Sequence, residues 1–528
     1  MAPELPPAVF KSWAPEWLIR ATLFLVATPA FMLLVLFSTN SSAIAGHYGV
    51  EPADVQFSLL VYYASLLAFF PFDARLSTYL PSRQYLLICS FLLLLTVALG
   101  TQLTDFRAQL ALRFVQGPLG GLVGSPCLTL IFSRLPTERQ RAMGYSVFYG
   151  ILLVSGPLST MMSWLVLDRF DVPALSHAFV LLQLPGVLLL AWLLHDVRLK
   201  RRFPLSQLEW PSWLLLAGTL LPVGYVVCYG EQLYWFESPR IGGALLLALA
   251  CGAAFGLRQL HLKRPYLDLR IFRFRNYRIG GLMFVLFYLC RGTTGVAAGY
   301  LAGITHGEGS AMAWLQVPTL VGIVLGVSVV VRFVLLDTPV RHIWVVGFAL
   351  LLVHHVWMYF LFGPGQQPAV FVLPLFVQGL GVGTIMVPTA TFALSALPPG
   401  ISQSGAYAAT IFRFAGFTGS MALISVLQPY WNTAQLASYR ADLVPGTSLV
   451  AARLQSTQQA LQSRGLAAET AQLAATRLLG SALSAQAQLR YCQNYFMLIS
   501  GLIVVVLLGL LVLPPLHRQV ASFRQTPL

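Results

Sequence analysis

Long apolar segments, separated by short polar or basic stretches, recur along the whole 528-residue chain. Each is long enough to cross a bilayer, because a spanning α-helix takes ~20 predominantly apolar residues. The pattern predicts fourteen spanning helices, near 21–45, 56–77, 85–103, 108–133, 143–167, 176–194, 211–229, 241–257, 279–302, 311–335, 342–362, 368–392, 404–427 and 494–515. We therefore expect an all-α polytopic membrane protein in contact with the lipid bilayer.

The composition supports this assignment. Apolar residues make up 57% of the chain and charged residues only 10%, whereas soluble domains carry about 45–50% and about 25%. A soluble chain of this length would need more charge to cover its surface. The composition excludes an ordinary soluble enzyme, a disordered protein and a small disulfide scaffold. The six cysteines form no CxxC motif and no pairing with histidine, so we predict neither a metal site nor a cofactor.

The formal net charge of +15 comes from 33 Lys and Arg against 18 Asp and Glu. Because the basic residues stand in short loops, they favour control of topology over binding of nucleic acid. With a cytoplasmic N-terminus, and with Arg75 and Arg332 at the cytoplasmic ends of their spans counted as inside, 22 Lys and Arg fall inside, 8 outside and 3 within spans, and five of the eight belong to the long segment 428–490. Both termini are therefore expected in the cytoplasm, and the chain in the inner (plasma) membrane.

The first apolar segment also resembles a signal peptide, because a basic stretch precedes it and Ala43-Ile44-Ala45 resembles a cleavage site. Its removal would leave thirteen spans and put Arg518 and Arg524 on the wrong side of the membrane. We therefore retain it as the first spanning helix.

An internal repeat links two spans. Residues 114–136 and 376–398 align at an offset of 262, with Phe-Val-Gln-Gly on Phe-Val-Gln-Gly and Leu-Pro on Leu-Pro at their ends, and Pro126 on Pro388. Chance similarity of two glycine-rich helices is the alternative. The aligned prolines favour a true repeat, in which the fourth span corresponds to the twelfth and two six-helix bundles enclose two extra helices.

This repeat divides the chain. We expect a cytoplasmic N-terminus at 1–20, a six-helix bundle at 21–194, cytoplasmic linkers with the two extra helices at 195–278, a second bundle at 279–515 with the external loop 428–490, and a cytoplasmic tail at 516–528.

Several motifs together resemble the fourteen-spanner drug–proton antiporter family (EmrB/QacA type) of the major facilitator superfamily. They are Arg113 with Gln116, Gly117, Gly120 and Gly121; Gly144, Gly150, Gly156 and Pro157; Tyr229-Gly230-Glu231 before Trp235-Phe236; Pro265 to Leu269 with Phe272, Asn276 and Tyr277; and Arg413 with Gly416 and Gly419. The resemblance runs from about residue 20 to 515. It implies the major facilitator fold and proton-coupled efflux of drugs.

The chain also departs from this family. After the second span, Ala74, Thr78 and Pro81 stand where the family carries Gly, Asp and Gly, and only Arg83 survives clearly. The aspartate of the first span is missing from the region around Asn40. The fifth-span Gly-Gly is Thr-Met at 160–161. These differences indicate a divergent member.

Charged residues within the spans are candidates for transport or proton coupling, because a charge costs roughly 2.5–3.5 kcal/mol or more in hydrocarbon. Arg113 is a relay or gating residue, or a strut bonded to neighbouring carbonyls. Arg291 could attract anionic groups of a substrate or serve as the same kind of strut, and Arg413 could face the cavity or serve packing. Asp73 is the best-placed carboxylate. His354 and His355 could titrate or simply pack.

A cavity with aromatic walls and few charges suits bulky amphipathic or cationic molecules. The residues expected to line it are Asn40, Tyr62, Tyr63, Gln116, Tyr149, Tyr288, Arg291, Trp357 and Gln378. The residues expected to serve close helix packing and conformational change are Arg83, Gly117, Gly120, Gly121, Gly144, Gly150, Gly156, Pro157, Gly379, Gly381 and Gly383.

These features predict a secondary exporter that works by alternating access, is coupled to protons and uses no ATP, since the sequence holds no GxxxxGK[ST] motif. An importer or lipid flippase on the same scaffold, a membrane sensor that does not transport, and a membrane-embedded enzyme are the alternatives. The helical runs 454–465 and 467–480 favour an amphipathic hairpin. This hairpin could contact a periplasmic adaptor and an outer-membrane channel, or form a solvated cap without function.

Overall fold

A computed structural model describes residues 9–134, 140–197, 208–336, 338–442 and 448–512. Within these residues the chain is helical, apart from one isolated bridge between Phe10 and Leu194. Fourteen helical segments are long and apolar enough to cross a membrane, which confirms the fourteen spans expected from the sequence. The basic cluster at 198–202, the Leu-Pro pair at 135–136 and the C-terminal tail lie outside the described residues.

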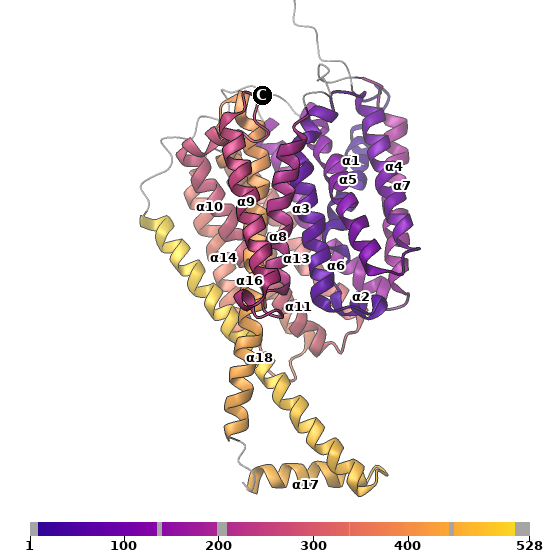
Figure 1. Ribbon diagram of the computed structural model, residues 1–528, viewed down its shortest axis with the longest axis vertical. Helices are drawn as coiled ribbons and strands as arrows, with labels where there is room; N and C mark the ends of the chain where they lie inside the picture. Colours follow the sequence, from indigo (N-terminus) through magenta and orange to yellow (C-terminus); the bar gives the residue numbers. More distant parts are fainter. Residues whose placement is uncertain (1–8, 135–139, 198–207, 337, 443–447, 513–528) are drawn as a thin grey trace, which may run out of the picture.

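The first six spans form one bundle, drawn in indigo to purple in Figure 1. They are α1 (Glu16–Leu36), α3 (Pro52–Leu76), α4 (Ser82–Gly100), α5 (Phe106–Ser133), α6 (Gln140–Leu167) and α7 (Val172–Leu193), with the short α2 (Ser41–Tyr48) between the first two. The first span ends earlier than the expected residue 45. The hydroxyls of Ser38 and Thr39 bond the Val35 carbonyl at 3.0 and 2.9 Å, and such local bonds compete with continuation of the helix.

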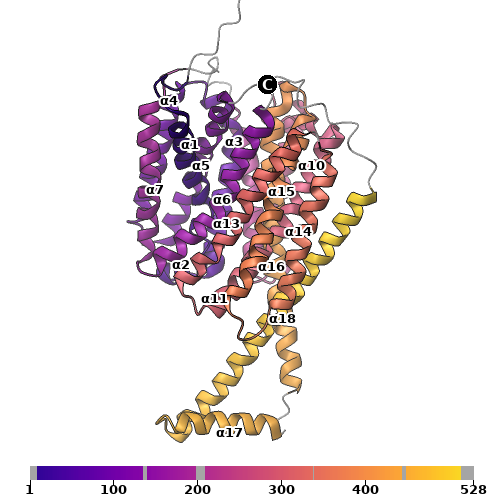
Figure 2. The same cartoon turned by 180° about the vertical axis from the view of Figure 1, so that it is seen from behind.

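The last six spans form the second bundle, on the other side of the molecule (Figure 2). They are α10 (Arg275–Arg291) continued by α11 (Thr293–Ile304), α12 (Gly309–Trp314) continued by α13 (Gln316–Leu335), α14 (Val340–Leu361), η4 (Pro368–Phe371) continued by α15 (Val372–Ser395), α16 (Pro399–Asp442) and α18 (Ala468–Val512).

The two bundles repeat the same arrangement of neighbours. In the first bundle α3 packs on α5, α1 on α6, and α4 on both α5 and α7. In the second, the corresponding helices α13 and α15, α10 and α16, and α14 with α15 and α18 pack in the same way. This is the parallel pseudo-symmetry expected from a repeat about an axis along the membrane normal.

Two glycines show the repeat at atomic scale. A Cβ placed on Gly117 of α5 would lie 2.3 Å from the Tyr62 carbonyl oxygen and 3.0 Å from the Leu66 nitrogen of α3. A Cβ on Gly379 of α15 would lie 2.2 Å from the Thr319 oxygen and 2.9 Å from the Ile323 nitrogen of α13. Gly117 and Gly379 are 262 residues apart, so the offset found in the sequence aligns two equivalent backbone contacts. Only a residue without a side chain fits such an approach.

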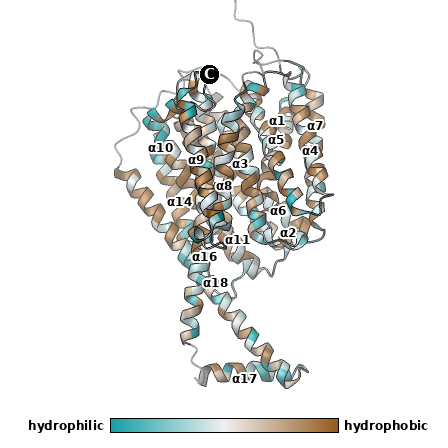
Figure 3. Ribbon diagram, viewed as in Figure 1, coloured by the Kyte–Doolittle hydropathy of each residue, from teal (hydrophilic) through white to brown (hydrophobic). Residues whose placement is uncertain are grey.

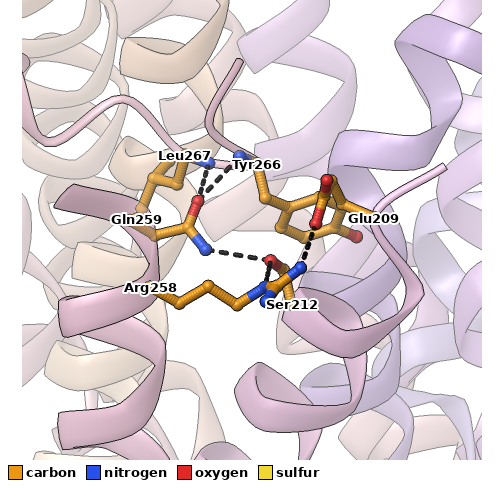
Figure 4. A network of polar contacts seen from close by, with 6 residues as sticks. All are labelled: Glu209, Ser212, Arg258, Gln259, Tyr266 and Leu267. Carbon is orange, nitrogen blue, oxygen red and sulfur yellow. Dashed lines mark hydrogen bonds and ion pairs between the residues drawn. The ribbon is translucent and has the colours of Figure 1, made fainter. Parts of the chain in front are cut away.

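The two extra helices, α8 (Trp210–Tyr229) and α9 (Pro239–His261), pack on each other, and α8 also contacts α3 and α16. Polar contacts at one end of this pair order the linker to α10 (Figure 4). Gln259 accepts hydrogen bonds from the backbone N–H groups of Tyr266 and Leu267 at 2.7 and 3.2 Å and donates to Ser212 at 3.0 Å. The Tyr266 hydroxyl then donates to the Ala68 carbonyl of α3 at 2.6 Å. The linker therefore ties the extra pair to the first bundle.

The segment 428–490 is mostly helical and projects beyond the bundles at the bottom of Figure 1. Two spans extend into it, because α16 continues to Asp442 and α18 begins at Ala468, and α17 (Ser448–Gln462) lies across the far end. Hydropathy alone could not give these boundaries, because the added turns are polar. Figure 3 shows this change from a mainly brown bundle to a more mixed projection.

Candidate functional site

An aromatic cavity lies between the two bundles. Its walls come from α1, α3, α5 and α6 of the first bundle and α15 and α16 of the second. They include Phe31, Tyr62, Tyr63, Leu66, Phe70, Tyr145, Phe148, Tyr149, Leu394, Ala406, Thr410 and Arg413. Three tyrosines expected in the cavity, Tyr62, Tyr63 and Tyr149, therefore line it together with Arg413. Arg413 is the charged residue among its described lining.

A second, more polar cavity adjoins the first at the end of α3. Its lining includes Asp73, Ser77, Ser82, Tyr85, Ser125, Thr129, Gln403 and Tyr407, and it shares Phe70, Ser125, Leu128 and Ala406 with the aromatic cavity. The Asp73 carboxylate accepts hydrogen bonds from the Tyr85 hydroxyl at 2.8 Å and the Ser125 hydroxyl at 2.7 Å. The two cavities thus share part of their walls, and the polar cavity holds an acid, Asp73, while the aromatic cavity holds a cation, Arg413.

Arg413 bridges the two bundles through aromatic rings. Its Nε donates to the Tyr288 hydroxyl at 3.2 Å, and its guanidinium lies 5.6 Å from the centre of the Tyr288 ring and 6.0 Å from that of Tyr149. A Cβ on Gly416 would lie 2.6 Å from the Val285 carbonyl oxygen of α10. This close approach, one turn along α16, holds Arg413 beside Tyr288.

Arg291 ends α10 at the same interface. Its guanidinium lies 6.0 Å from the centre of the Tyr288 ring. A Cβ on Gly156 of α6 would come within 3.2 Å of Arg291 Nη2. Gly156, one of the expected conformational glycines, therefore leaves room for a cation of the opposite bundle. Tyr288 and Arg291, both expected in the cavity, are not among its described lining residues; Tyr288 is buried, and its ring lies near both arginines.

Arg113 has a different environment, inside the first bundle. It donates to the Leu33 carbonyl at 3.0 Å, the Leu34 carbonyl at 3.1 Å and the Gln116 side chain at 3.4 Å. It also lies 4.5 Å from the centre of the Tyr62 ring. The last four carbonyls of a helix have no partner within the helix, and α1 ends at Leu36. Arg113 therefore caps the last turn of α1, which is the arrangement of a strut.

The histidine pair lies inside the second bundle, away from both cavities. His354 contacts the Pro374 carbonyl at 2.9 Å, and His355 contacts the Leu351 carbonyl at 2.6 Å. His355 Nε2 is 3.1 Å from the Thr293 hydroxyl, at the break between α10 and α11. His354 Nε2 is buried without a partner among the described residues.

Other residues expected in the cavity lie elsewhere. Gln116 is buried within the first bundle, where it donates to the Thr96 carbonyl at 3.3 Å. Gln378 is buried within α15. Asn40 precedes α2, where it accepts from the Ser42 hydroxyl at 3.4 Å. Trp357 is 36% exposed on α14, because it stands on the face opposite the core positions Phe348, Leu351 and Met358.

The three fifth-span glycines face different neighbours. Gly144 leaves room for Phe132 of its own bundle, whereas Gly150 and Gly156 face Val327 and Arg291 of the other bundle. Six residues advance a helix by one and two-thirds turns, so glycines at this spacing do not form one stripe. Of these, only Gly150 and Gly156 lie at the bundle interface.

The remaining conformational candidates lie within the bundles. A Cβ on Gly120 would meet the Tyr62 hydroxyl at 2.0 Å, and one on Gly121 would meet Leu66 at 3.4 Å. Gly381 and Gly383 approach the backbones of α14 and α13. Pro157 is buried inside α6, and Arg83 is half-buried in the first turn of α4.

Sequence reasoning did not identify several lining residues, notably Phe70, Tyr145, Phe148, Thr410 and Tyr407. Some of them could have been found from the sequence, because they lie whole helical turns away from residues that were identified. Thr410 and Ala406 lie one and two turns before Arg413 in α16, and Phe70 lies two turns after Tyr63 in α3. Among the described residues no group of three or more His, Cys, Asp or Glu is arranged to hold a metal ion.

Two pseudo-symmetric six-helix bundles that share a central cavity are the architecture of a multi-pass membrane transporter. A profile described as Major Facilitator Superfamily matches residues 23–421, and the chain belongs to that superfamily. The family indicates a transporter rather than an enzyme.

Relatives and solved structures agree with this assignment. Multidrug export protein EmrB of Escherichia coli (strain K12) is 24% identical over 287 residues, 53% of each chain, so the match spans about half the length of that relative. EmrB of Haemophilus influenzae is 23% identical over 332 residues, 62% of this chain and 63% of its own. A crystal structure of peptide transporter POT in complex with sulfate superposes with a TM-score of 0.59 at 13% identity, covering 98% of this chain and 97% of that chain. The chain is a divergent member, similar to EmrB-type proteins.

Proposed function

We propose that this protein is a secondary exporter of amphipathic small molecules, acts by alternating access and resides in the inner membrane. One observation carries the proposal: the aromatic cavity has walls from both bundles. Because neither bundle encloses the cavity alone, a rotation of one bundle against the other would change which side of the membrane the cavity faces.

The two ends of the interface support such a motion. Both cavities lie toward the end of α3 that carries Asp73. Toward the opposite end, the backbone N–H of Gly309 in α12 donates to the Asp168 carboxylate at 3.1 Å, just beyond α6. A Cβ on Gly309 would lie 2.6 Å from the Trp164 carbonyl oxygen. The interface is therefore hollow at one end and closely packed at the other, as in one state of an alternating cycle.

The direction of transport depends on topology. The bias of Lys and Arg supports cytoplasmic termini, so the hollow end would face the cytoplasm and load substrate from there. The low-identity similarity to proteins named multidrug export protein supports efflux as the direction.

Proton coupling belongs to the same proposal. Asp73 lies in the polar cavity with two hydroxyl partners, next to the path that substrate would take. A carboxylate in this position can exchange a proton when substrate or water changes its surroundings. His355, against Thr293 at the α10–α11 break, is the second candidate.

The projection formed by 428–490 is proposed as the contact for a periplasmic adaptor, which would connect the exporter to an outer-membrane channel. Two membrane-spanning helices extend into it without interruption. Movement of the second bundle would therefore be transmitted to the projection directly.

Everted membrane vesicles test the proposal. Vesicles that contain the full-length protein should accumulate more of a fluorescent amphipathic dye than vesicles without it. Accumulation should rise further when the vesicle interior is made more acidic than the medium. A collapse of the gradient with a protonophore should reverse the second effect. Flux that ignores the gradient would refute proton coupling, and no flux of any amphipathic dye would refute the exporter itself.

A further inference from the structure

Two cations of the second bundle lie against one tyrosine, Tyr288, and one of them, Arg413, lines the aromatic cavity. Arg413 and Arg291 lie 5.6 and 6.0 Å from the centre of the Tyr288 ring. Arg413 uses one donor, Nε, in a protein hydrogen bond. A guanidinium carries five N–H donors in a planar fork, so Arg413, which lines the cavity, has four donors without a protein hydrogen bond among the described contacts.

Neither arginine has a carboxylate partner among the described residues. Ion pairs there join Glu16 with Arg20 and Arg134, Arg258 with Glu209, and Arg270 with Asp268. Asp73 instead bonds Tyr85 and Ser125. Cations within a membrane protein pair with acids or carbonyls, or else mark a substrate path. Contact with the faces of tyrosine rings lowers the free-energy cost of burying these two cations but does not neutralise their charge.

The surroundings of the two cations are apolar and aromatic. Tyr63, Phe70, Phe148 and Tyr149 line the same cavity as Arg413, and Tyr63 packs on Phe414 of α16 at 5.2 Å between ring centres. A molecule that fits this cavity has a flat or chain-like apolar body. The charge that would complete the cavity is negative.

Building on the proposed function, we propose that the cavity selects amphipathic organic anions, with a carboxylate or sulfonate group bound at Arg413. Arg291 adds attraction from the adjacent position, and the apolar body of the anion packs on the aromatic walls. The sequence predicted amphipathic or cationic substrates, whereas a negative charge fits this cavity, because no acid lines its described part.

Three probes of one shape test the charge preference: 2-naphthoate, 2-naphthamide and 2-naphthyltrimethylammonium. Binding is measured on the purified full chain in nanodiscs of phosphatidylcholine, so that no anionic lipid competes. We expect the carboxylate to bind best. Arg413→Gln should weaken naphthoate binding roughly tenfold to a hundredfold, because a charge-assisted hydrogen bond is lost, and should leave naphthamide binding unchanged.

Further variants separate recognition from folding. Arg413→Lys should retain most of the preference for naphthoate, and Arg291→Gln should weaken it less than Arg413→Gln does. Arg240→Gln, on the exposed surface of α9, is the matched control and should change nothing. Equal binding of the three probes, preference for the ammonium, or an unchanged preference in Arg413→Gln would overturn the proposal.

Measurements of probe flux into proteoliposomes distinguish failure of the anion site from failure of the proposed transport function. Naphthoate that binds through Arg413 but does not cross proteoliposomes would uphold the anion site and refute transport. Equal flux and equal binding of all three probes would uphold transport and refute the anion site.

Discussion

The arginines of the two bundles differ in what they contact. Arg113 of the first bundle is held by two backbone carbonyls of α1, whereas Arg413 and Arg291 of the second bundle lie against tyrosine rings at the interface. The three arginines stand on helices that the repeat does not pair, since Arg113 is on α5, Arg413 on α16 and Arg291 on α10. An arginine bonded to the end of a helix by two carbonyls serves the architecture, whereas an arginine with one described hydrogen bond at the interface can serve a ligand.

The largest expected effect is on the free energy of unfolding, which should fall much more when Arg113 is replaced than when Arg413 is replaced. Arg113→Met leaves the Leu33 and Leu34 carbonyls without their donor, which should cost roughly 2–4 kcal/mol of unfolding free energy. Arg413→Met removes one hydrogen bond, to Tyr288, together with a cation that has no carboxylate partner among the described residues, so it should cost about 1 kcal/mol or less. Unfolding titrations in mixed micelles measure both. Equal destabilisation by the two variants would contradict the comparison.

A second prediction tests what the bundles share. Gly117→Ala and Gly379→Ala place a Cβ against carbonyl oxygens at 2.3 and 2.2 Å, so each should lower stability by roughly 1–3 kcal/mol through overpacking. Gly501→Ala is the control, because nothing lies within 4 Å of its Cβ. If only one of the two variants lost stability, the two glycine contacts would not be energetically equivalent.

A third prediction compares the tyrosine beside each arginine. Tyr288 accepts a hydrogen bond from Arg413, whereas the buried Tyr62 hydroxyl near Arg113 has no partner among the described residues. Tyr288→Phe should therefore cost about 1 kcal/mol of stability, and Tyr62→Phe should cost nothing. Melting curves of the two variants in the same detergent decide this, and the opposite order would be inconsistent with the assigned contacts.

The smallest effect concerns an arginine outside the spans that does pair with an acid. Hydrogen bonds from the Arg270 side chain hold the pKa of the Asp268 carboxyl below its usual range. A lowered pKa stabilises the folded state above the unfolded value of about 4, and this stabilisation disappears as the pH falls through the folded value. Asp268→Asn should lower the melting temperature slightly at pH 7, and the difference should shrink below pH about 4. A difference that grows with acidity would contradict the sign.

The architecture could be predicted from the sequence more completely than the functional site could. Hydropathy gave the fourteen spans, and one repeated glycine motif paired the bundles, because close helix packing needs small residues at fixed positions. The sequence alone could not distinguish the role of Arg113 from that of Arg413. Whether an arginine meets a carbonyl depends on where a neighbouring helix ends, and α1 ends early because of Ser38 and Thr39.

The cavity was predictable only in part for a similar reason. Tyr62, Tyr63 and Tyr149 were identifiable as aromatics within spans, but so was Trp357, which lies on the outer face of α14. Aromatic content does not tell which face of a helix meets the other bundle. That information came from the packing of α3 and α6 against α16 and α13.

The central claim, that the two bundles move against each other around the cavity, has a direct test. Gly150 of α6 and Val327 of α13 face each other across the interface, with 3.6 Å between a Cβ on Gly150 and Val327 Cγ1. A sulfur in the place of Val327 Cγ1 would lie close to the side chain of a cysteine at position 150, so the Gly150→Cys, Val327→Cys variant is the pair to cross-link. Oxidation should stop dye flux and reduction should restore it, while the same oxidant leaves wild-type flux unchanged. Full flux through completely cross-linked protein would show that the bundles need not move against each other.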